Sequence, residues 1–336
     1  MVGETARQGV SREMALAPMV RRTDRHCRVL HRILAPRSWL YTEMVVADSI
    51  VFGRATAKLD FSQEEHPIAV QLAGSDPSIM SQAGKLVEAR GFDAINLNLG
   101  CPAGRATAGE FGACQMKSPT SVARLIETIR GEVSIPVTLK CRTGVDAHDS
   151  PRFLEEFVHA VSEAGVDTLI VHARKALLTG FSTRQNRNVP PLDYERVRLL
   201  KSRFPSLKVH LNGGIDNCPT VRSALLWADG VMIGRAAYRD PMFMARVHQE
   251  VHGQDPGLTV DDVLLRYRKY VERELTRGTK LQPMVRHIAG LIRGRPGSAR
   301  IRRCLGNASR SSAAGLEVID NVLRMLRRLP DDQLVH

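Results

Sequence analysis

Eight short apolar segments recur between residues 15 and 233, and a segment with helical periodicity separates each from the next. Most are continuous apolar runs, as expected for strands that are buried on both faces. Strands that alternate with helices are typical of parallel pairing, because a parallel connection needs a long crossover. The predicted strands occupy residues 15–19, 39–45, 68–73, 94–99, 137–141, 168–172, 208–212 and 230–233.

The intervening segments carry helix start and stop signals. Residues 150–165 have Ser150 as a candidate N-cap, Pro151 at the first helical position and Gly165 as the stop. Residues 79–91 repeat apolar side chains at helical spacing and end at Gly91. The same plan predicts helices within residues 118–131, 193–204, 218–228 and 240–251.

This alternation predicts an α/β fold, a (β/α)₈ TIM barrel over residues 14–252, close to the typical size of ~250 residues. The alternative, an open doubly wound sheet, usually carries a G-x-G-x-x-G motif, and the chain has none. Residues 255–336 read as purely helical and predict a small, basic, all-helical C-terminal domain. Residues 1–13 are expected to form a flexible N-terminal extension.

The charge of the chain indicates an anionic partner. The formal net charge is +13, and seven arginines lie between residues 286 and 310 without one acidic residue. Positive charges at this density repel one another unless a bound anion neutralises them. This favours nucleic acid, a polyanion, as the partner. A solvated helical face is the alternative.

The six cysteines are scattered and contain no C-x-x-C pair. This pattern predicts neither a disulfide framework nor a metal site. The first residues lack the apolar core of a signal peptide, and no apolar run is long enough to span a bilayer. We therefore expect a cytoplasmic protein, with a monomer as the default state.

Polar residues follow the predicted strands at the end where TIM barrels build their active sites. The segment Asn212-Gly213-Gly214 follows the seventh strand, and Gly234 with Arg235 follows the eighth. Glycines let backbone N–H groups approach an anion, and a guanidinium suits phosphate oxygens. The sequence therefore predicts a phosphate at this side of the barrel mouth.

The middle of the mouth is predicted to hold a planar ring. Lys140 and His172 end the fifth and sixth strands, while Gln71 and Asn98 offer amides that pair with donors and acceptors. A lysine at the end of an apolar strand needs a partner. A phosphate, a ring and a central cation together suggest FMN, whose reduced form a cation stabilises.

The ordered set of motifs resembles the tRNA-dihydrouridine synthases of the A type over nearly the whole chain. A single motif such as Gly-Cys-Pro would be weak, whereas the ordered set is specific. The motifs are APM at 17–19, TDRHCR at 23–28, YTEMV at 41–45, NLNLGCP at 96–102, GEFGACQM at 109–116, VTLKCRTGVD at 137–146, VHARKA at 171–176, NRNVPPLDY at 186–194, LNGGI at 211–215 and GVMIGRAAY at 230–238.

The resemblance implies a flavoenzyme that reduces the C5–C6 bond of uridines in the D loop of tRNA, at positions 20 and 20a, with NADPH as reductant. Hydride from flavin N5 would go to C6, and Cys101 corresponds to the acid that protonates C5. An ordinary thiol is mostly protonated at neutral pH and can donate without special tuning. Cys114 is expected to be structural.

The resemblance also assigns ligand contacts residue by residue. Asn98 would contact the target nucleotide, and Arg184, Arg187, Arg300 and Arg303 would orient the tRNA. The chain departs from the family pattern at Arg21-Arg22, where Asp-Trp is usual, and at Ala103-Gly104, where Ser-Asp is usual. The residues that correspond to flavin contacts are Pro18, Met19, Val20, Gln71, Lys140, His172, Asn212, Gly213, Gly214, Gly234 and Arg235.

Three other functions fit parts of the pattern. A small-molecule flavin oxidoreductase would share the FMN site but would not need the arginine-rich helical domain. A non-catalytic RNA-binding module would not need Cys101 and Lys140 at strand ends. An aldolase that forms a Schiff base on Lys140 would hold no flavin.

Overall fold

A computed structural model describes residues 12–104, 109–294, 297–308, 311 and 314–327. Its eight parallel strands form one sheet in the order β1-β8-β7-β6-β5-β4-β3-β2. A parallel bridge between Ala15 and Trp39 joins β1 to the chain that enters β2 and closes the barrel. The strands are β1 (Glu13–Leu16), β2 (Leu40–Val46), β3 (Ile68–Ala73), β4 (Ala94–Leu99), β5 (Val137–Arg142), β6 (Thr168–His172), β7 (Lys208–Asn212) and β8 (Gly230–Ile233).

The predicted TIM barrel is confirmed, with one clear error at the first strand. The sequence places that strand over residues 15–19, whereas β1 runs from Glu13 to Leu16. Pairing with β8 fixes the start, because Glu13 lies opposite Gly230. Pro18 has no N–H for a sheet ladder, so the chain leaves the sheet before it. Residues 1–11 of the expected N-terminal extension lie outside the described residues.

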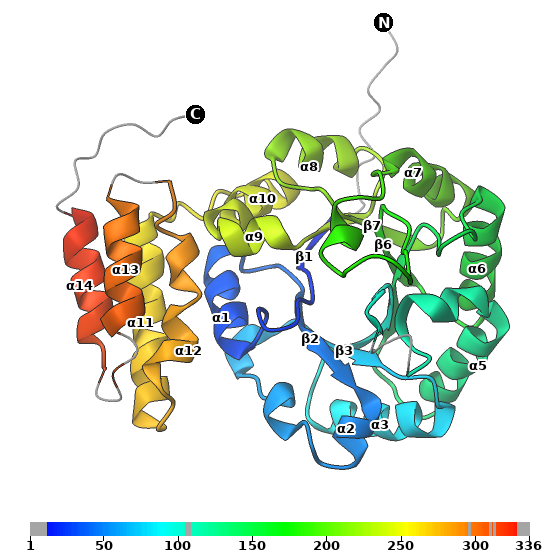
Figure 1. Ribbon diagram of the computed structural model, residues 1–336, viewed down its shortest axis with the longest axis horizontal. Helices are drawn as coiled ribbons and strands as arrows, with labels where there is room; N and C mark the ends of the chain where they lie inside the picture. The colour runs from blue at the N-terminus through cyan, green and yellow to red at the C-terminus, as the bar shows by residue number, and fades with distance from the viewer. Residues whose placement is uncertain (1–11, 105–108, 295–296, 309–310, 312–313, 328–336) are drawn as a thin grey trace, which may run out of the picture.

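Helices surround the sheet as an outer ring (Figure 1). Side-chain caps start several of them at the predicted residues, since Ser150 accepts from the Phe153 N–H and Asp193 from the Arg196 N–H. The ring comprises α1 (Arg25–Leu34), α2 (Ala47–Val51), α3 (Pro77–Ala89), α5 (Pro119–Arg130), α6 (Pro151–Glu163), α7 (Tyr194–Arg203), α8 (Cys218–Leu225), α9 (Arg235–Arg239) and α10 (Met242–His252). Short 3₁₀ turns are η1 (Thr56–Leu59), η2 (Gln63–Glu65), η3 (Gly112–Lys117) and η4 (Gln185–Arg187).

The apolar core has two parts. The larger part lies between the strands and the helical ring, where side chains such as Leu16, Leu72 and Phe157 are fully buried. The smaller part comes from alternate strand positions and fills the inside of the barrel. Its members are Ala15, Ala17, Tyr41, Ala69, Ala94, Ile170 and Met232, with Trp39 packed against them.

After α10 the described chain is helical: α11 (Val260–Thr276), α12 (Leu281–Val285), η5 (Ile288–Gly290), α13 (Ser298–Ala308) and α14 (Glu317–Arg327). Figure 1 shows these helices gathered on one side of the barrel, next to α1. None of the helices that the structure describes is long and apolar enough to cross a bilayer.

Polar contacts join α1 to these C-terminal helices. Asp24 caps α1, and its carboxylate also accepts from His287 Nε2 at 2.9 Å. Arg25 forms an ion pair with the buried Glu274 of α11. The Tyr267 hydroxyl donates to the His26 carbonyl at 3.2 Å. The C-terminal helices therefore dock on the strand-end side of α1, beside the barrel mouth.

Candidate active site

Lys140 and Asn212 form the polar centre of the barrel mouth. Lys140 Nζ, at the end of β5, donates to Asn212 Oδ1 at 2.9 Å, and Asn212 Nδ2 donates to the Met232 carbonyl of β8 at 2.8 Å. Burial and, to a lesser extent, the nearby Arg142 guanidinium together lower the pKa of Lys140 to about 7. The sequence predicted that this lysine needs a partner, and Asn212 is one.

A second row of amides crosses three strands on the other side of the mouth. Gln71 Nε2 donates to Asn96 Oδ1 at 2.8 Å, and Asn96 Nδ2 donates to Thr138 Oγ1 at 3.0 Å. Asn98 Nδ2 donates to Gln71 Oε1 at 2.7 Å. These bonds fix the direction in which each amide presents its donor and acceptor. Asn96 and Thr138 support the row although neither belongs to the predicted site.

Asn98 also positions the segment that carries Cys101. Its Oδ1 accepts from the Cys101 N–H at 3.0 Å and from the Gly100 N–H at 3.2 Å. Cys101 is partly exposed and lies close enough to Lys140 to influence the pKa of that amine. Cys114 differs, because its Sγ donates to the Phe111 carbonyl at 3.3 Å and burial raises its pKa.

His172 ends β6 and packs against the glycine turn after β7. A Cβ added at Gly213 would lie 2.4 Å from the His172 ring, and φ there is +101°, so only glycine fits. Burial lowers the pKa of His172 well below its usual value, and the charges of Arg142 and Lys140 lower it further. The imidazole is therefore neutral at physiological pH and offers one donor and one acceptor.

The predicted phosphate side has room for a methyl group at one of its glycines. A Cβ added at Gly214 would collide with Leu192, whereas one at Gly234 would meet no protein atom closer than 3.5 Å. Arg235 directs Nη1 to Asn188 Oδ1 at 2.6 Å and Nη2 to the Arg187 carbonyl at 3.0 Å. These two bonds hold the guanidinium of Arg235, the residue after Gly234, against the end of η4.

The loop after β1 brings three further predicted residues to the mouth. Met19 begins a tight turn in which its carbonyl accepts from the Arg22 and Thr23 N–H groups, both at 3.0 Å. Met19 Sδ lies 3.9 Å from a Cβ built on Gly234, so this loop borders the phosphate side. Pro18 is partly buried and Val20 is exposed.

Arg142 connects the two sides of the mouth, and no ligand contact or catalytic role was predicted for it. Its Nε donates to the Gly100 carbonyl at 3.0 Å, and its Nη1 donates to the Asn186 carbonyl at 3.0 Å. One buried guanidinium thus ties the Cys101 segment to η4, which carries Arg187. In the sequence, Arg142 was noticeable only as a second positively charged residue close to Lys140.

The four predicted tRNA arginines do not lie together. Arg184 and Arg187 flank η4 at the barrel mouth. Arg300 and Arg303 are exposed on α13, within the C-terminal helices on the side of α1 away from the barrel centre (Figure 1). Any ligand that touches both pairs must therefore bridge the barrel and the helices.

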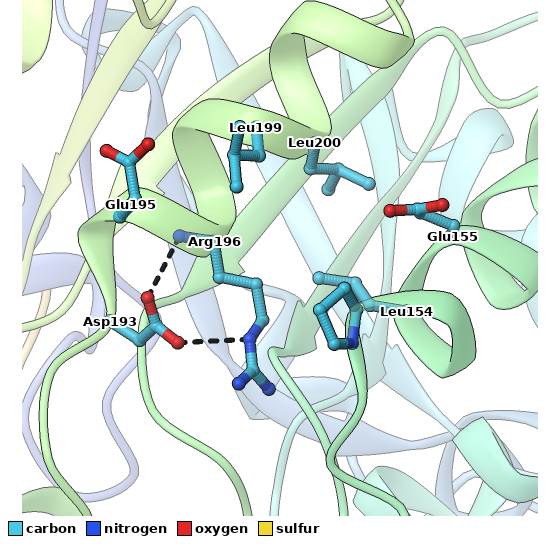
Figure 2. A pocket seen from close by; sticks show the side chains of 8 residues that line it. Leu154, Glu155, Asp193, Glu195, Arg196, Leu199 and Leu200 are labelled. Atoms are coloured by element: carbon cyan, nitrogen blue, oxygen red, sulfur yellow. Dashed lines mark hydrogen bonds and ion pairs between the residues drawn. The ribbon is translucent and has the colours of Figure 1, made fainter.

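A small hollow on the outer ring lies between α6 and α7 and contains none of the predicted site residues. Asp193, which caps α7 and pairs with Arg196 Nε at 3.0 Å, lines it (Figure 2). Glu155, Glu195, Leu154 and Leu200 also line it. Arg196 is the one cation among the residues that line this hollow, it is paired with Asp193, and no glycine lines it.

Fold and site together define a (β/α)₈-barrel enzyme whose mouth combines a buried lysine, a neutral histidine, fixed amides and a thiol. The sequence model of the dihydrouridine synthase (Dus) family matches residues 15–327. The chain belongs to this family, whose members are flavin-dependent oxidoreductases.

Curated relatives match over almost their full length. The tRNA-dihydrouridine(20/20a) synthase of Vibrio cholerae serotype O1 is 43% identical over 312 residues, covering 92% of this chain and 95% of the relative. The enzyme of the same name from Escherichia coli K12 is 44% identical over 318 residues, covering 94% and 92%. That of Xanthomonas axonopodis pv. citri is 42% identical over 323 residues, covering 96% of each.

Among solved structures, a 2-naphthoyl-CoA reductase in complex with 2-naphthoyl-CoA matches with a TM-score of 0.52. The two chains are 10% identical, and the match covers 70% of this chain and 49% of the other. At this identity the likeness concerns the barrel fold alone.

Proposed function

We propose that this protein reduces the C5–C6 bond of uridine in the D loop of tRNA to 5,6-dihydrouridine, at positions 20 and 20a. Membership of the dihydrouridine synthase family and the names of relatives above 40% identity support this reaction. The observation that carries the assignment within the site is the convergence of Cys101 and Lys140 on one barrel mouth.

We propose FMN as the resident cofactor and NADPH as the reductant. The donor set fits a flavin mononucleotide in two respects. The space above Gly234 beside Arg235 suits a phosphate, and the row of Gln71 and Asn98 amides suits the polar edge of a ring. Bound FMN supplies a hydride. Pro18, Met19, Val20, His172, Gly213 and Gly214 would complete its binding site.

Lys140 and Asn212 have complementary roles in this proposal. Burial holds the pKa of the Lys140 amine near 7, so a nearby negative charge readily raises it and fixes a proton there. Asn212 holds the amine in place through its Oδ1 at 2.9 Å. The lysine thereby stabilises negative charge on the ring without leaving the centre of the mouth.

Cys101 supplies the second half of the addition. A hydride at uracil C6 leaves the electron pair of the former double bond at C5, and the Cys101 thiol donates a proton there. The bond from the Asn98 amide to the Cys101 N–H fixes the segment that carries this thiol. Asn98 would also contact the target nucleotide.

The C-terminal helical region, residues 255–336, would bind tRNA, with Arg300 and Arg303 on α13. Arg184 and Arg187 at the mouth would bind the part of the D loop that enters the barrel. The target base must leave the helical stack to reach the mouth. We place the protein in the cytoplasm, as a monomer.

The test uses purified protein and unmodified tRNA. We expect a yellow protein that releases FMN on denaturation and, with NADPH, forms dihydrouridine at positions 20 and 20a, mapped by primer extension. Colourless protein that takes up no added FMN contradicts the proposal. A borohydride-trapped adduct on Lys140 in such a protein would support a Schiff-base enzyme instead, for which the lowered pKa of Lys140 is also suitable.

A further inference from the structure

The turn after β1 presents an arginine at the mouth that the site described above does not use. The Met19 carbonyl accepts two N–H groups of this turn, and the Thr23 hydroxyl accepts the Met19 N–H at 2.9 Å. Arg21 adopts φ 62°, in the left-handed region, and reverses the chain direction. The rigid turn leaves Arg22 exposed at its tip.

The guanidinium of Arg22 lies over an aromatic ring from the last barrel segment. Its guanidinium carbon is 4.4 Å from the centroid of Tyr238, which belongs to α9. The Tyr238 ring in turn contacts the edge of His287 in the C-terminal helices, with centroids 5.8 Å apart. Arg22 therefore stands where the barrel mouth meets the helical region.

Among the described residues, Arg22 has no carboxylate partner. Within the described part of the chain, no Asp or Glu forms an ion pair with it, although Asp24, two residues on, is engaged by Arg286 and His287. A guanidinium stacked on a ring keeps its N–H edge free for an oxyanion. Tyr238 thus orients Arg22, and no acidic residue in the described ranges pairs with it.

The neighbours of Arg22 are themselves cations. Burial lowers the pKa of Arg187, and the positive charges of Arg22 and Arg184 lower it further. Burial likewise lowers the pKa of Arg235, which also feels Arg187. These guanidiniums raise one another's free energy, and an anion bound among them relieves that repulsion.

We propose that Arg22 binds a backbone phosphate of the tRNA at the junction of the barrel and the C-terminal helices, next to the nucleotide that enters the mouth. The inference rests on the proposed tRNA substrate. A guanidinium fork can contact two oxygens of one phosphate, and Tyr238 prevents it from swinging away. The cations continue from Arg22 past Arg187 to Arg184, which suits a polynucleotide better than one isolated phosphate.

The experiment measures tRNA affinity at several salt concentrations for the full-length protein and for Arg22→Gln. Loss of one phosphate contact should reduce the slope of log affinity against log salt by about 0.7–0.9. Relative to 1 M salt, this corresponds at about 0.1 M salt to an affinity that is about five- to eightfold weaker. FMN content and the rate of NADPH oxidation should not change.

Arg90→Gln is the matched control. Arg90 is an exposed arginine at the end of α3, on the face of the barrel opposite the mouth, and its loss should leave affinity and slope unchanged. Arg22→Lys tests whether the planar, bidentate shape of the guanidinium matters in addition to its charge. It should restore the slope because the charge returns, but only part of the affinity, because an ammonium neither stacks nor forks in the same way.

The outcomes separate this inference from the proposed function. If the unmodified protein binds no tRNA, the proposed function fails. If it binds tRNA and Arg22→Gln binds with the same affinity and slope, only the role of Arg22 is wrong. If Arg22→Gln slows NADPH oxidation and leaves tRNA affinity intact, the bound phosphate belongs to the dinucleotide and the inference is overturned.

Discussion

The amine of Lys140, at the end of β5, donates a 2.9 Å hydrogen bond to the side-chain carbonyl of Asn212, at the end of β7. The two strands are separated by β6, so the bond spans the mouth rather than following a sheet ladder. Alternate strands of a TIM barrel contribute side chains to one layer, and these two residues share such a layer. The bond places one titratable cation at the centre of the proposed flavin site.

Flavin affinity of the apoprotein should depend on pH through Lys140. In the apoprotein the Lys140 amine has a pKa of about 7, so the amine loses its positive charge as pH rises from about 6 to about 9. If flavin binding favours the charged amine, affinity falls over this range, by at most about tenfold per pH unit. His172 stays neutral throughout because its pKa is far lower.

Flavin fluorescence quenching between these pH values measures the effect. In Lys140→Met the affinity should be weaker and flat with pH. An unmodified apoprotein whose flavin affinity does not change with pH would show that the lysine charge is not used in binding.

Cys101→Ala should retain FMN and accept electrons from NADPH, yet form dihydrouridine about 10²–10⁴-fold more slowly, because the proton donor for C5 is gone. Cys114→Ala is the matched control, since the Cys114 thiol donates to the Phe111 carbonyl. Single-turnover reaction of the reduced enzyme with tRNA isolates the step. Normal rates in Cys101→Ala would assign the proton to another group.

Two glycine variants separate folding from ligand binding. Gly213→Ala places a Cβ 2.4 Å from His172 at φ +101°, so it should lower the melting temperature of the apoprotein. Gly234→Ala meets no protein atom closer than 3.5 Å and should fold nearly as well, but its methyl occupies the proposed phosphate space and should weaken FMN binding. If Gly234→Ala binds FMN with the same affinity as the unmodified protein, the phosphate of FMN does not lie next to Gly234.

Charge reversal on α13 tests the docking of tRNA on the C-terminal helices. Arg300→Glu with Arg303→Glu should weaken tRNA binding and flatten its salt dependence while FMN content stays constant. Lys85→Glu with Arg90→Glu on α3 makes the same charge change at another exposed site. If the two double variants bind tRNA alike, α13 has no specific role.

A buried ion pair fixes the segment before β3. Arg28 Nε lies 2.6 Å from Glu65 Oε2, with side chains 2% and 0% exposed. Arg28→Met leaves Glu65 buried without its cation and should cost about 3–5 kcal/mol of folding free energy. Arg152→Ala removes an exposed pair with Glu156 and should barely change the melting temperature. Denaturant unfolding of both variants makes the comparison.

The sequence alone was enough to predict the barrel, because strands that are buried on both faces appear in the sequence as short apolar segments. The strands β3, β4, β6, β7 and β8 have the predicted bounds, since each is a short segment rich in apolar residues between helix signals. β1 was misplaced because its start depends on pairing with β8, more than two hundred residues away in sequence. The sequence also predicted that the polar residues after the strands lie at the barrel mouth, because all strands of a parallel barrel end on the same side.

Only the tertiary structure decided which of those residues meet. Closure of the barrel brings Lys140 to Asn212 and lets Arg142 reach the Asn186 carbonyl. No periodic pattern in the sequence indicates either contact. The stacking of Arg22 on Tyr238 depends on the first and last barrel segments lying side by side. Local periodicity reports whether a side chain is buried, whereas its partner is set by the register and closure of the whole sheet.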